Sequence, residues 1–215
     1  MKVDLLVHGA AELLVIPGQG PGAGSSKGDL GIIRDGAVAI AGELVVAVGH
    51  SADLLRLADG HTTTVNAVGG VVMPGFVDAH THAVFAGDRA AEFEQRIRGE
   101  SYMQIMAAGG GIMSTVRATR AVSLDDLVRQ SSARLDRMLA HGTTTAEVKT
   151  GYGLDAIHEL KMLRAIAALQ RNCPVDLVPT FLGAHAVPTE WAAHPDGYVD
   201  EIIGKMLPAV CGGES

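Results

Sequence analysis

The chain has 215 residues, of which 47% are hydrophobic and 4% aromatic, and its net charge is −7. This size allows one large or two small domains, and the acidic balance excludes the basic surface that a nucleic-acid partner requires. Two cysteines are too few for a disulfide framework and are typical of a reducing compartment. No apolar run approaches the ~18 residues of a membrane span, and no secretory signal is evident. We therefore expect a cytoplasmic protein without a membrane partner.

Residues 1–72 predict a small, β-rich, sandwich-like domain. A pair of short apolar runs within 3–16 and further runs up to residue 48 are separated by turn signals such as Asp35-Gly36. Between them, the Gly/Ser/Pro-rich segment 18–31 superficially resembles a phosphate loop. A phosphate loop needs Gly directly before its Lys and a helix after it, and Ser26 precedes Lys27 here. We therefore expect a surface loop.

Residues 73–215 predict alternating strands and helices. Strands are expected at 76–82, 143–148 and 175–182. Helices are expected at about 89–107, from Ser123 to Gly142, from Asp155 to Pro174, and at about 196–206, with Ser123 and Asp155 as caps. The Gly109–Gly111 triplet follows a helix and lacks dinucleotide-binding spacing, so we interpret it as a tight loop near the pocket. This alternation indicates a parallel sheet or barrel, whose chemistry gathers at the carboxyl ends of the strands.

All three predicted strands end in polar, glycine-bearing segments. The first ends in His80 and His82, which share a face with Asp78 and form a pair that can hold a divalent metal. The other two lead to Tyr152 and His185. Each residue also has an interpretation without a functional role. His80 and His82 could be ordinary histidines at a strand end, Tyr152 a turn residue between glycines, and His185 a loop histidine with satisfied hydrogen bonds. Three strand ends with residues of this kind together favour an α/β enzyme.

Four segments carry a resemblance to a known family. The run GGVVMPGFVDAHTH at 69–82 resembles the entry strand of the metal-dependent amidohydrolase superfamily. Within that superfamily, AGGGIMSTV with ATR at 108–120, EVKTGYGL at 147–154 and TFLGAHAVP at 180–188 resemble the imidazolonepropionase family. The resemblance extends from about residue 60 to 210, and its motifs go well beyond the paired histidines.

The resemblance implies hydrolysis of the cyclic amide C–N bond of 4-imidazolone-5-propanoate to N-formimino-L-glutamate, by water activated on one Zn²⁺ or Fe²⁺ ion. It implies His80 and His82 as the first two metal ligands and Arg89 as the partner of the propionate group. Tyr152 and His185 would contact the imidazolone ring and the carboxylate end. Tyr102 is a weaker candidate for the same pocket. Without the family pattern, Arg89 would be interpreted as a surface charge at a helix start.

The resemblance also implies a (β/α)8 TIM-type barrel, which typically needs about 250 residues. Residues 73–215 supply only its first strand–helix units, so we expect the general base and the remaining ligands beyond residue 215. For Glu147 a structural or supporting role is at least as good an interpretation as a catalytic one. The alternatives are another cyclic amidohydrolase or an aminohydrolase of the same superfamily, or a truncated, non-catalytic remnant. A homodimer is compatible with all of them.

Overall fold

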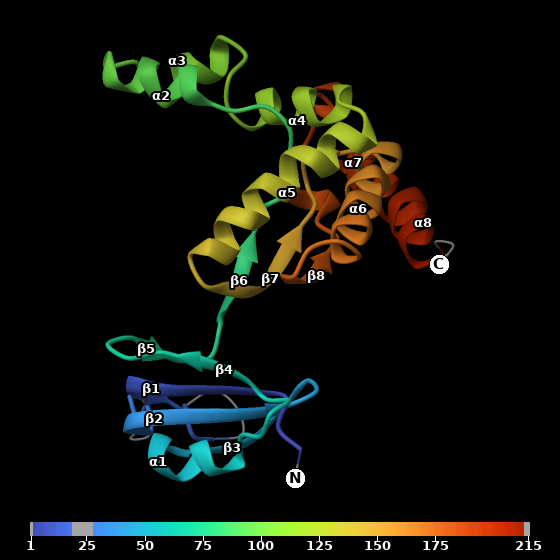
Figure 1. The fold of residues 1–215 in the computed structure, drawn as a ribbon. Coiled ribbons are helices and arrows are strands. Elements are labelled where there is room, and N and C mark those ends of the chain that lie inside the picture. Colours follow the sequence, from blue (N-terminus) through green and yellow to red (C-terminus); the bar gives the residue numbers. More distant parts are fainter. Residues whose placement is uncertain (1, 19–27, 213–215) are drawn as a thin grey trace. The chain divides into compact units, whose positions relative to one another are not determined.

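The computed structural model describes residues 2–18 and 28–212, which fall into two compact units, Met1–Pro74 and Gly75–Ser215 (Figure 1). The phosphate-loop-like stretch at 20–27 lies outside the described residues, as do the last three residues of the chain.

The first unit is a mainly antiparallel sheet with the strand order β3-β2-β1-β4, and β5 pairs with β1 as well. The antiparallel pairs are β1 with β2 and β2 with β3, whereas β4 and β5 run parallel to β1. The bounds are Leu5–Leu14 for β1, Ile32–Ala41 for β2, Leu44–His50 for β3, Thr63–Asn66 for β4 and Val71–Val72 for β5. The short helix α1 (Ser51–Leu54) packs against β1, β2 and β3. The described residues of this unit form this one sheet, without a second sheet facing it.

The predicted pair of runs within residues 3–16 is one strand, β1, with a bulge between Val7 and Ala10. Gly9 has a φ of +73°, which side-chain-bearing residues rarely adopt, and its N–H donates to the Ser51 hydroxyl at 2.8 Å. The bulge keeps the strand continuous where the sequence pattern breaks. Leu6, Ala39 and Leu54 lie in the small core of this unit.

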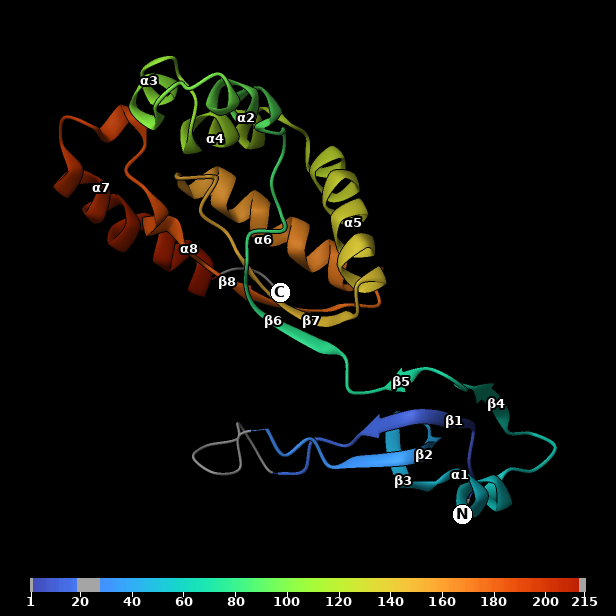
Figure 2. The same cartoon turned by 90° about the vertical axis from the view of Figure 1, so that its left-hand side faces the viewer.

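The second unit is built on a parallel three-stranded sheet with the order β6-β7-β8. These strands are Phe76–Thr81 (β6), Thr143–Lys149 (β7) and Asp176–Thr180 (β8), and the helices α5 (Leu124–Ala140) and α6 (Ala156–Gln170) pack on β7 and β8 respectively (Figure 2). The predicted α/β pattern is therefore confirmed for this part of the chain.

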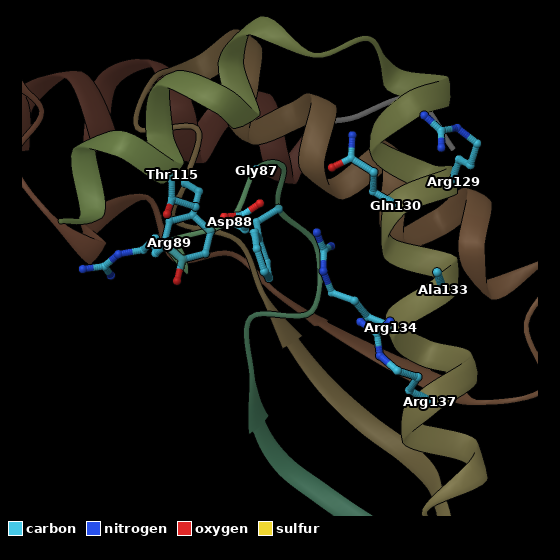
Figure 3. Close-up of a pocket in the computed structure, with 11 residues that line it drawn as sticks. Gly87, Asp88, Arg89, Thr115, Arg129, Gln130, Ala133, Arg134 and Arg137 are labelled. Carbon is cyan, nitrogen blue, oxygen red and sulfur yellow. The ribbon is translucent and has the colours of Figure 1, made fainter. Parts of the chain in front are cut away.

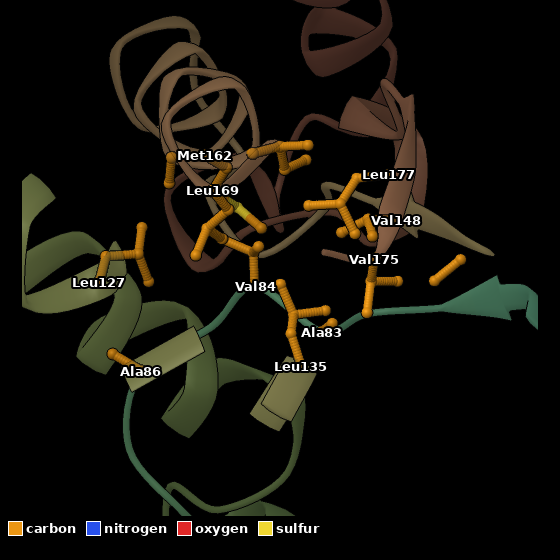
Figure 4. Close-up of a cluster of buried hydrophobic side chains, with 13 residues drawn as sticks. Ala83, Val84, Ala86, Leu127, Leu135, Val148, Met162, Leu169, Val175 and Leu177 are labelled. Carbon is orange, nitrogen blue, oxygen red and sulfur yellow. The ribbon is translucent and has the colours of Figure 1, made fainter. Parts of the chain in front are cut away.

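The core of the second unit lies between the sheet and the helices α5 and α6 (Figure 4). Alternate residues of β7 point into it, and Ala146 and Val148 are completely buried. Leu127 and Leu135 from α5 and Met162 from α6 are equally buried. Because the other β7 side chains alternate to the opposite face, Glu147 and Lys149 lie on the side of the sheet where the candidate site forms.

Both predicted helix caps are present. The Ser123 hydroxyl accepts from the Asp126 N–H at 3.1 Å at the start of α5, and an Asp155 carboxylate oxygen accepts from the His158 N–H at 2.8 Å at the start of α6. Each cap satisfies a backbone donor that the first helical turn leaves free, which is why the sequence located these starts correctly.

Four expectations for this unit were wrong in detail. The helix expected at 89–107 is two helices, α2 (Ala90–Ile97) and α3 (Tyr102–Ala107), because Gly99 turns with a φ of +92° and Ser101 starts a new capping box with Gln104. Helix α4 (Ile112–Ala121) was not predicted. The third strand, β8, is shorter than expected. The last helix is α7 (Pro195–Glu201), continued by a π-helical turn and α8 (Leu207–Cys211). Within the described ranges, no helix is long and apolar enough to cross a membrane.

Candidate functional site

The carboxyl ends of the three parallel strands bring His82, Tyr152 and His185 together. The His82 and His185 rings are stacked, with centroids 4.5 Å apart and planes 12° from parallel. The Tyr152 ring centroid lies 5.1 Å from that of His82 and 5.4 Å from that of His185. The His80 ring is 6.0 Å from the His82 ring, on the same side of β6, and is more exposed. Three of the predicted site residues therefore form one aromatic cluster, with His80 next to it.

Two backbone carbonyls orient the stacked histidines. The Nδ1 atom of His82 lies 3.1 Å from the Thr150 carbonyl oxygen, and that of His185 lies 3.0 Å from the Gly151 carbonyl oxygen. A carbonyl only accepts, so each Nδ1 carries the hydrogen, and each Nε2 presents its lone pair when the ring is neutral. Burial, followed by the nearby His185, lowers the pKa of His82, which favours this neutral form.

The turn after β7 has a conformation that only its glycines permit. Gly151 has a φ of +103°, and a Cβ atom there would lie 2.7 Å from the His185 Cβ. A Cβ atom on Gly153 would lie 2.4 Å from the Glu159 backbone nitrogen. The sequence Lys149-Thr150-Gly151-Tyr152-Gly153 therefore lets the turn touch both the His185 side chain and the start of α6.

Arg89 lies at the start of α2 and is paired with Glu92. The Arg89 Nε donates to a Glu92 carboxylate oxygen at 2.7 Å, and the other Glu92 oxygen accepts from the Gly111 N–H at 2.8 Å. The hydrogen bond from Arg89 is the main reason why the pKa of Glu92 is lowered. The same bond is the main cause that raises the pKa of Arg89, and the phenols of Tyr102 and Tyr152 add smaller contributions. Arg89 and Tyr152 also line a common cleft.

Tyr102 is the predicted site residue that joins the cluster least. It begins α3 and its side chain is half exposed. In the part of the chain that the structure describes, no ring contact joins Tyr102 to the imidazoles. Among the described residues, the connection of Tyr102 to the site is its small contribution to the raised pKa of Arg89.

A cleft of about 700 Å³ is lined by Tyr152 and by residues of α5. Figure 3 shows Gln130, Ala133 and Arg134 on the α5 side of this cleft. The Arg134 guanidinium lies over the Phe85 ring, 3.7 Å from its centroid, and donates to the Ala83 carbonyl at 3.0 Å. Arg89 lines the same cleft, but its guanidinium points away from Arg134 in Figure 3. The cleft is rich in arginine and leads to the aromatic cluster, which suits an anionic small molecule.

Glu147 lies near His80 on the open face of the sheet, where it is paired. Its carboxylate accepts from Lys149 and from the Thr180 hydroxyl, and these two bonds, Lys149 first, lower the pKa of Glu147. Its Oε2 atom is buried and has no hydrogen-bond partner among the described residues. The pairing to Lys149 and Thr180 corresponds to the supporting role weighed from the sequence.

Sequence reasoning missed three residues that lie at the site or next to it. Glu92 was detectable, because it lies three residues after Arg89 on a predicted helix. Glu159 was detectable as a lone charge on the apolar face that includes Met162 and Ile166. Arg134 left no such signal, because its contact with Phe85 joins residues that are far apart in the chain.

No protein-family model matches the chain, whereas curated relatives do. The imidazolonepropionase of Halobacterium salinarum is 54% identical over 214 residues, which are 99% of this chain and 49% of the relative. That of Chloroflexus aggregans is 52% identical over 207 residues, 95% of this chain and 48% of the relative. The chain thus spans about half the length of the curated relatives that it matches.

Two solved structures with a similar fold superpose with TM-scores above 0.5. E. coli guanine deaminase superposes with a TM-score of 0.59 at 19% identity, over 83% of this chain and 37% of that chain. A triazine hydrolase variant superposes with a TM-score of 0.51 at 17% identity, over 98% of this chain and 43% of that chain. These likenesses concern the fold alone and support the α/β fold of the second unit. The resemblance found in the sequence motifs is confirmed: across nearly its whole length, the chain is similar to the N-terminal portion of the imidazolonepropionases.

Proposed function

We propose that the protein to which this chain belongs hydrolyses the cyclic amide C–N bond of 4-imidazolone-5-propanoate and releases N-formimino-L-glutamate. The observation that carries the proposal is the 54% identity to an imidazolonepropionase over 99% of the chain. The aromatic cluster at the strand ends supports it, because a planar ring can lie against Tyr152 and His185. The strands β6–β8 would then be the first units of a (β/α)8 barrel, preceded by the small β-rich domain of residues 1–72.

In this proposal, Arg89 binds the propionate group of the substrate. Its planar donors match the two oxygens of a carboxylate, and its pairing with the Glu92 carboxylate supports the choice of a carboxylate partner. Tyr102 and Tyr152 flank that position, and Tyr152 and His185 contact the imidazolone ring. The general base is not assigned to any residue of this chain.

His80 and His82 suit a divalent metal as part of a larger ligand set. The His82 Nδ1–H is held by the Thr150 carbonyl, so its Nε2 atom is oriented as a ligand, and the lowered pKa of His82 keeps that atom unprotonated. Among residues 2–18 and 28–212, no group of three or more His, Cys, Asp or Glu side chains converges for a metal. A bound Zn²⁺ or Fe²⁺ ion would supply a Lewis acid that activates water near neutral pH. Its remaining ligands would come from elsewhere in the protein.

The test begins with reading the coding frame that contains these residues to both of its ends and purifying the encoded protein. Incubation with 4-imidazolone-5-propanoate should yield N-formimino-L-glutamate, measured by mass spectrometry, and the metal content is measured in parallel. Hydantoins and nucleobases serve as competing substrates. Turnover of one of these instead would favour another hydrolase of the superfamily. Absence of all turnover in a folded, metal-loaded protein would refute the proposal.

The proposal includes a cytoplasmic location, supported by the two free cysteines of the described residues, Cys173 and Cys211. It also includes the homodimer, which light scattering on the purified protein tests directly. A monomer at micromolar concentration would remove that part of the proposal and leave the reaction unaffected.

A further inference from the structure

Glu159 is a fully buried carboxylate that none of the roles described above uses. It lies in the first turn of α6, and its oxygens accept from three backbone N–H groups of the turn after β7. The Gly153 and Leu154 nitrogens lie 2.8 Å from Oε1, and the Gly151 nitrogen lies 3.1 Å from both oxygens. A buried charge is tolerated only where donors of this kind compensate it. The carboxylate and the turn therefore stabilise each other.

The turn that Glu159 holds also holds the two stacked histidines. The carbonyls of Thr150 and Gly151 accept from the Nδ1 atoms of His82 and His185. The backbone N–H of Gly151 donates to Glu159. One residue, Gly151, thus connects the buried carboxylate on its nitrogen side to the His185 ring on its carbonyl side.

The turn needs such support because its backbone conformation is uncommon. Leu154 has a φ of +54°, a region that residues with a side chain rarely adopt. Such a conformation persists only where the surroundings determine it. At Leu154 they do so from both sides, since its N–H donates to Glu159 and its carbonyl accepts from Arg120 at 3.1 Å.

We propose that Glu159 is a positioning residue of the candidate site. It fixes the turn at residues 150–154, and through that turn it sets the Nδ1–H tautomers of His82 and His185 and the place of the Tyr152 ring. Its consequence for hydrolysis rests on the proposed function, whereas its effect on the rings is a property of this chain alone.

The variant Glu159→Gln tests this inference, because it keeps the shape of the side chain, removes the charge and places an amide group opposite the donors. The measurement is the NMR spectrum of the metal-free, 215-residue chain with ¹⁵N-labelled histidine at about pH 8, above the usual histidine pKa of about 6.5. The unaltered chain should show protonated Nδ1 and unprotonated Nε2 in both rings, with nuclear Overhauser effects between Tyr152 and each imidazole. In Glu159→Gln we expect mixed tautomers and the loss of those Overhauser effects.

A matched control separates positioning from general destabilisation. Leu135→Ala creates a cavity in the α5 part of the core and should lower the melting temperature while leaving the tautomers and the Overhauser effects as they are. Unchanged tautomers and Overhauser effects in a folded Glu159→Gln chain would overturn the inference.

If Glu159→Gln does not fold, Glu159→Asp decides, because it keeps the charge but is one methylene too short to reach all three N–H groups. Mixed tautomers in Glu159→Asp support the inference, and wild-type tautomers overturn it. The NMR measurement needs neither substrate nor metal. A failure of the proposed hydrolysis would therefore leave its result interpretable, and the reverse also holds.

Discussion

Replacing Arg120 by methionine should destabilise the second unit through lost bonds to backbone carbonyls more than through lost ion pairs. The Arg120 Nε donates to the Gly153 carbonyl at 2.6 Å and its Nη2 to the Leu154 carbonyl at 3.1 Å. Arg120 also pairs with Asp155 at 3.3 Å and with Glu190 at 2.8 Å. Arg120→Met removes all four interactions and retains much of the apolar stem.

The exposure of the partners decides which loss dominates. The Asp155 and Glu190 side chains are 32% and 48% exposed, so each ion pair should contribute only about 0–1 kcal/mol. A bond from a charged donor to a carbonyl contributes about 1.5–3 kcal/mol when shielded from water, and the Arg120 side chain is only 23% exposed. Allowing for partial solvation, we expect the free energy of unfolding to fall by about 2–4 kcal/mol.

The assay is urea unfolding of this chain, followed by the fluorescence of Trp191, its single tryptophan, which lies in the second unit. The control is Arg98→Met, which removes a pair with Glu94 in which both side chains are more than 60% exposed, and it should cost at most about 0.5 kcal/mol. In 1 M NaCl, which screens charges beyond about 3 Å, most of the Arg120→Met loss should persist. An Arg120→Met loss no larger than that of the control, or one that vanishes in 1 M NaCl, would refute the reasoning.

Three further outcomes follow from the structure. Under the proposed function, Arg89→Ala in the full-length protein should raise KM for 4-imidazolone-5-propanoate about 10- to 100-fold, the equivalent of one lost charged hydrogen bond, and Arg89→Lys should recover only part of that loss. Steady-state kinetics with an unchanged KM would contradict the proposed role of Arg89. Gly151→Ala should lower the melting temperature of this chain, because Gly151 has a φ of +103° and an added Cβ atom would lie 2.7 Å from the His185 Cβ. Gly204→Ala is the control: nothing lies within contact distance of an added Cβ atom there, so the melting temperature should stay unchanged or rise. Equal shifts for the two variants would contradict this account. Leu135→Ala should lower the free energy of unfolding, measured in urea, by about 2–5 kcal/mol, because Leu135 is completely buried. Ile203→Ala should lower it far less, because Ile203 is 59% exposed. Similar losses for the two variants would contradict the assignment of Leu135 to the core.

The sequence by itself determined the elements whose signals are local. Helices α5 and α6 were predicted because Ser123 and Asp155 cap them, and β6 and β7 because each leads into a polar, glycine-bearing segment. Because the carboxyl ends of parallel strands meet at one edge of a sheet, His82 and His185 could be expected at one site without coordinates. The family motifs supplied the likeness that the curated relatives confirm.

Only the tertiary structure decided how these residues are held. The stacking of His82 on His185 joins two strand ends more than a hundred residues apart in the chain. The three N–H groups on Glu159 depend on the backbone angles of a turn, which sequence periodicity does not encode. Residue type and spacing specify which groups reach the edge of the sheet. The packing of one turn against one helix specifies which atom of each imidazole faces the site, because a hydrogen bond forms only when both partners are already in place.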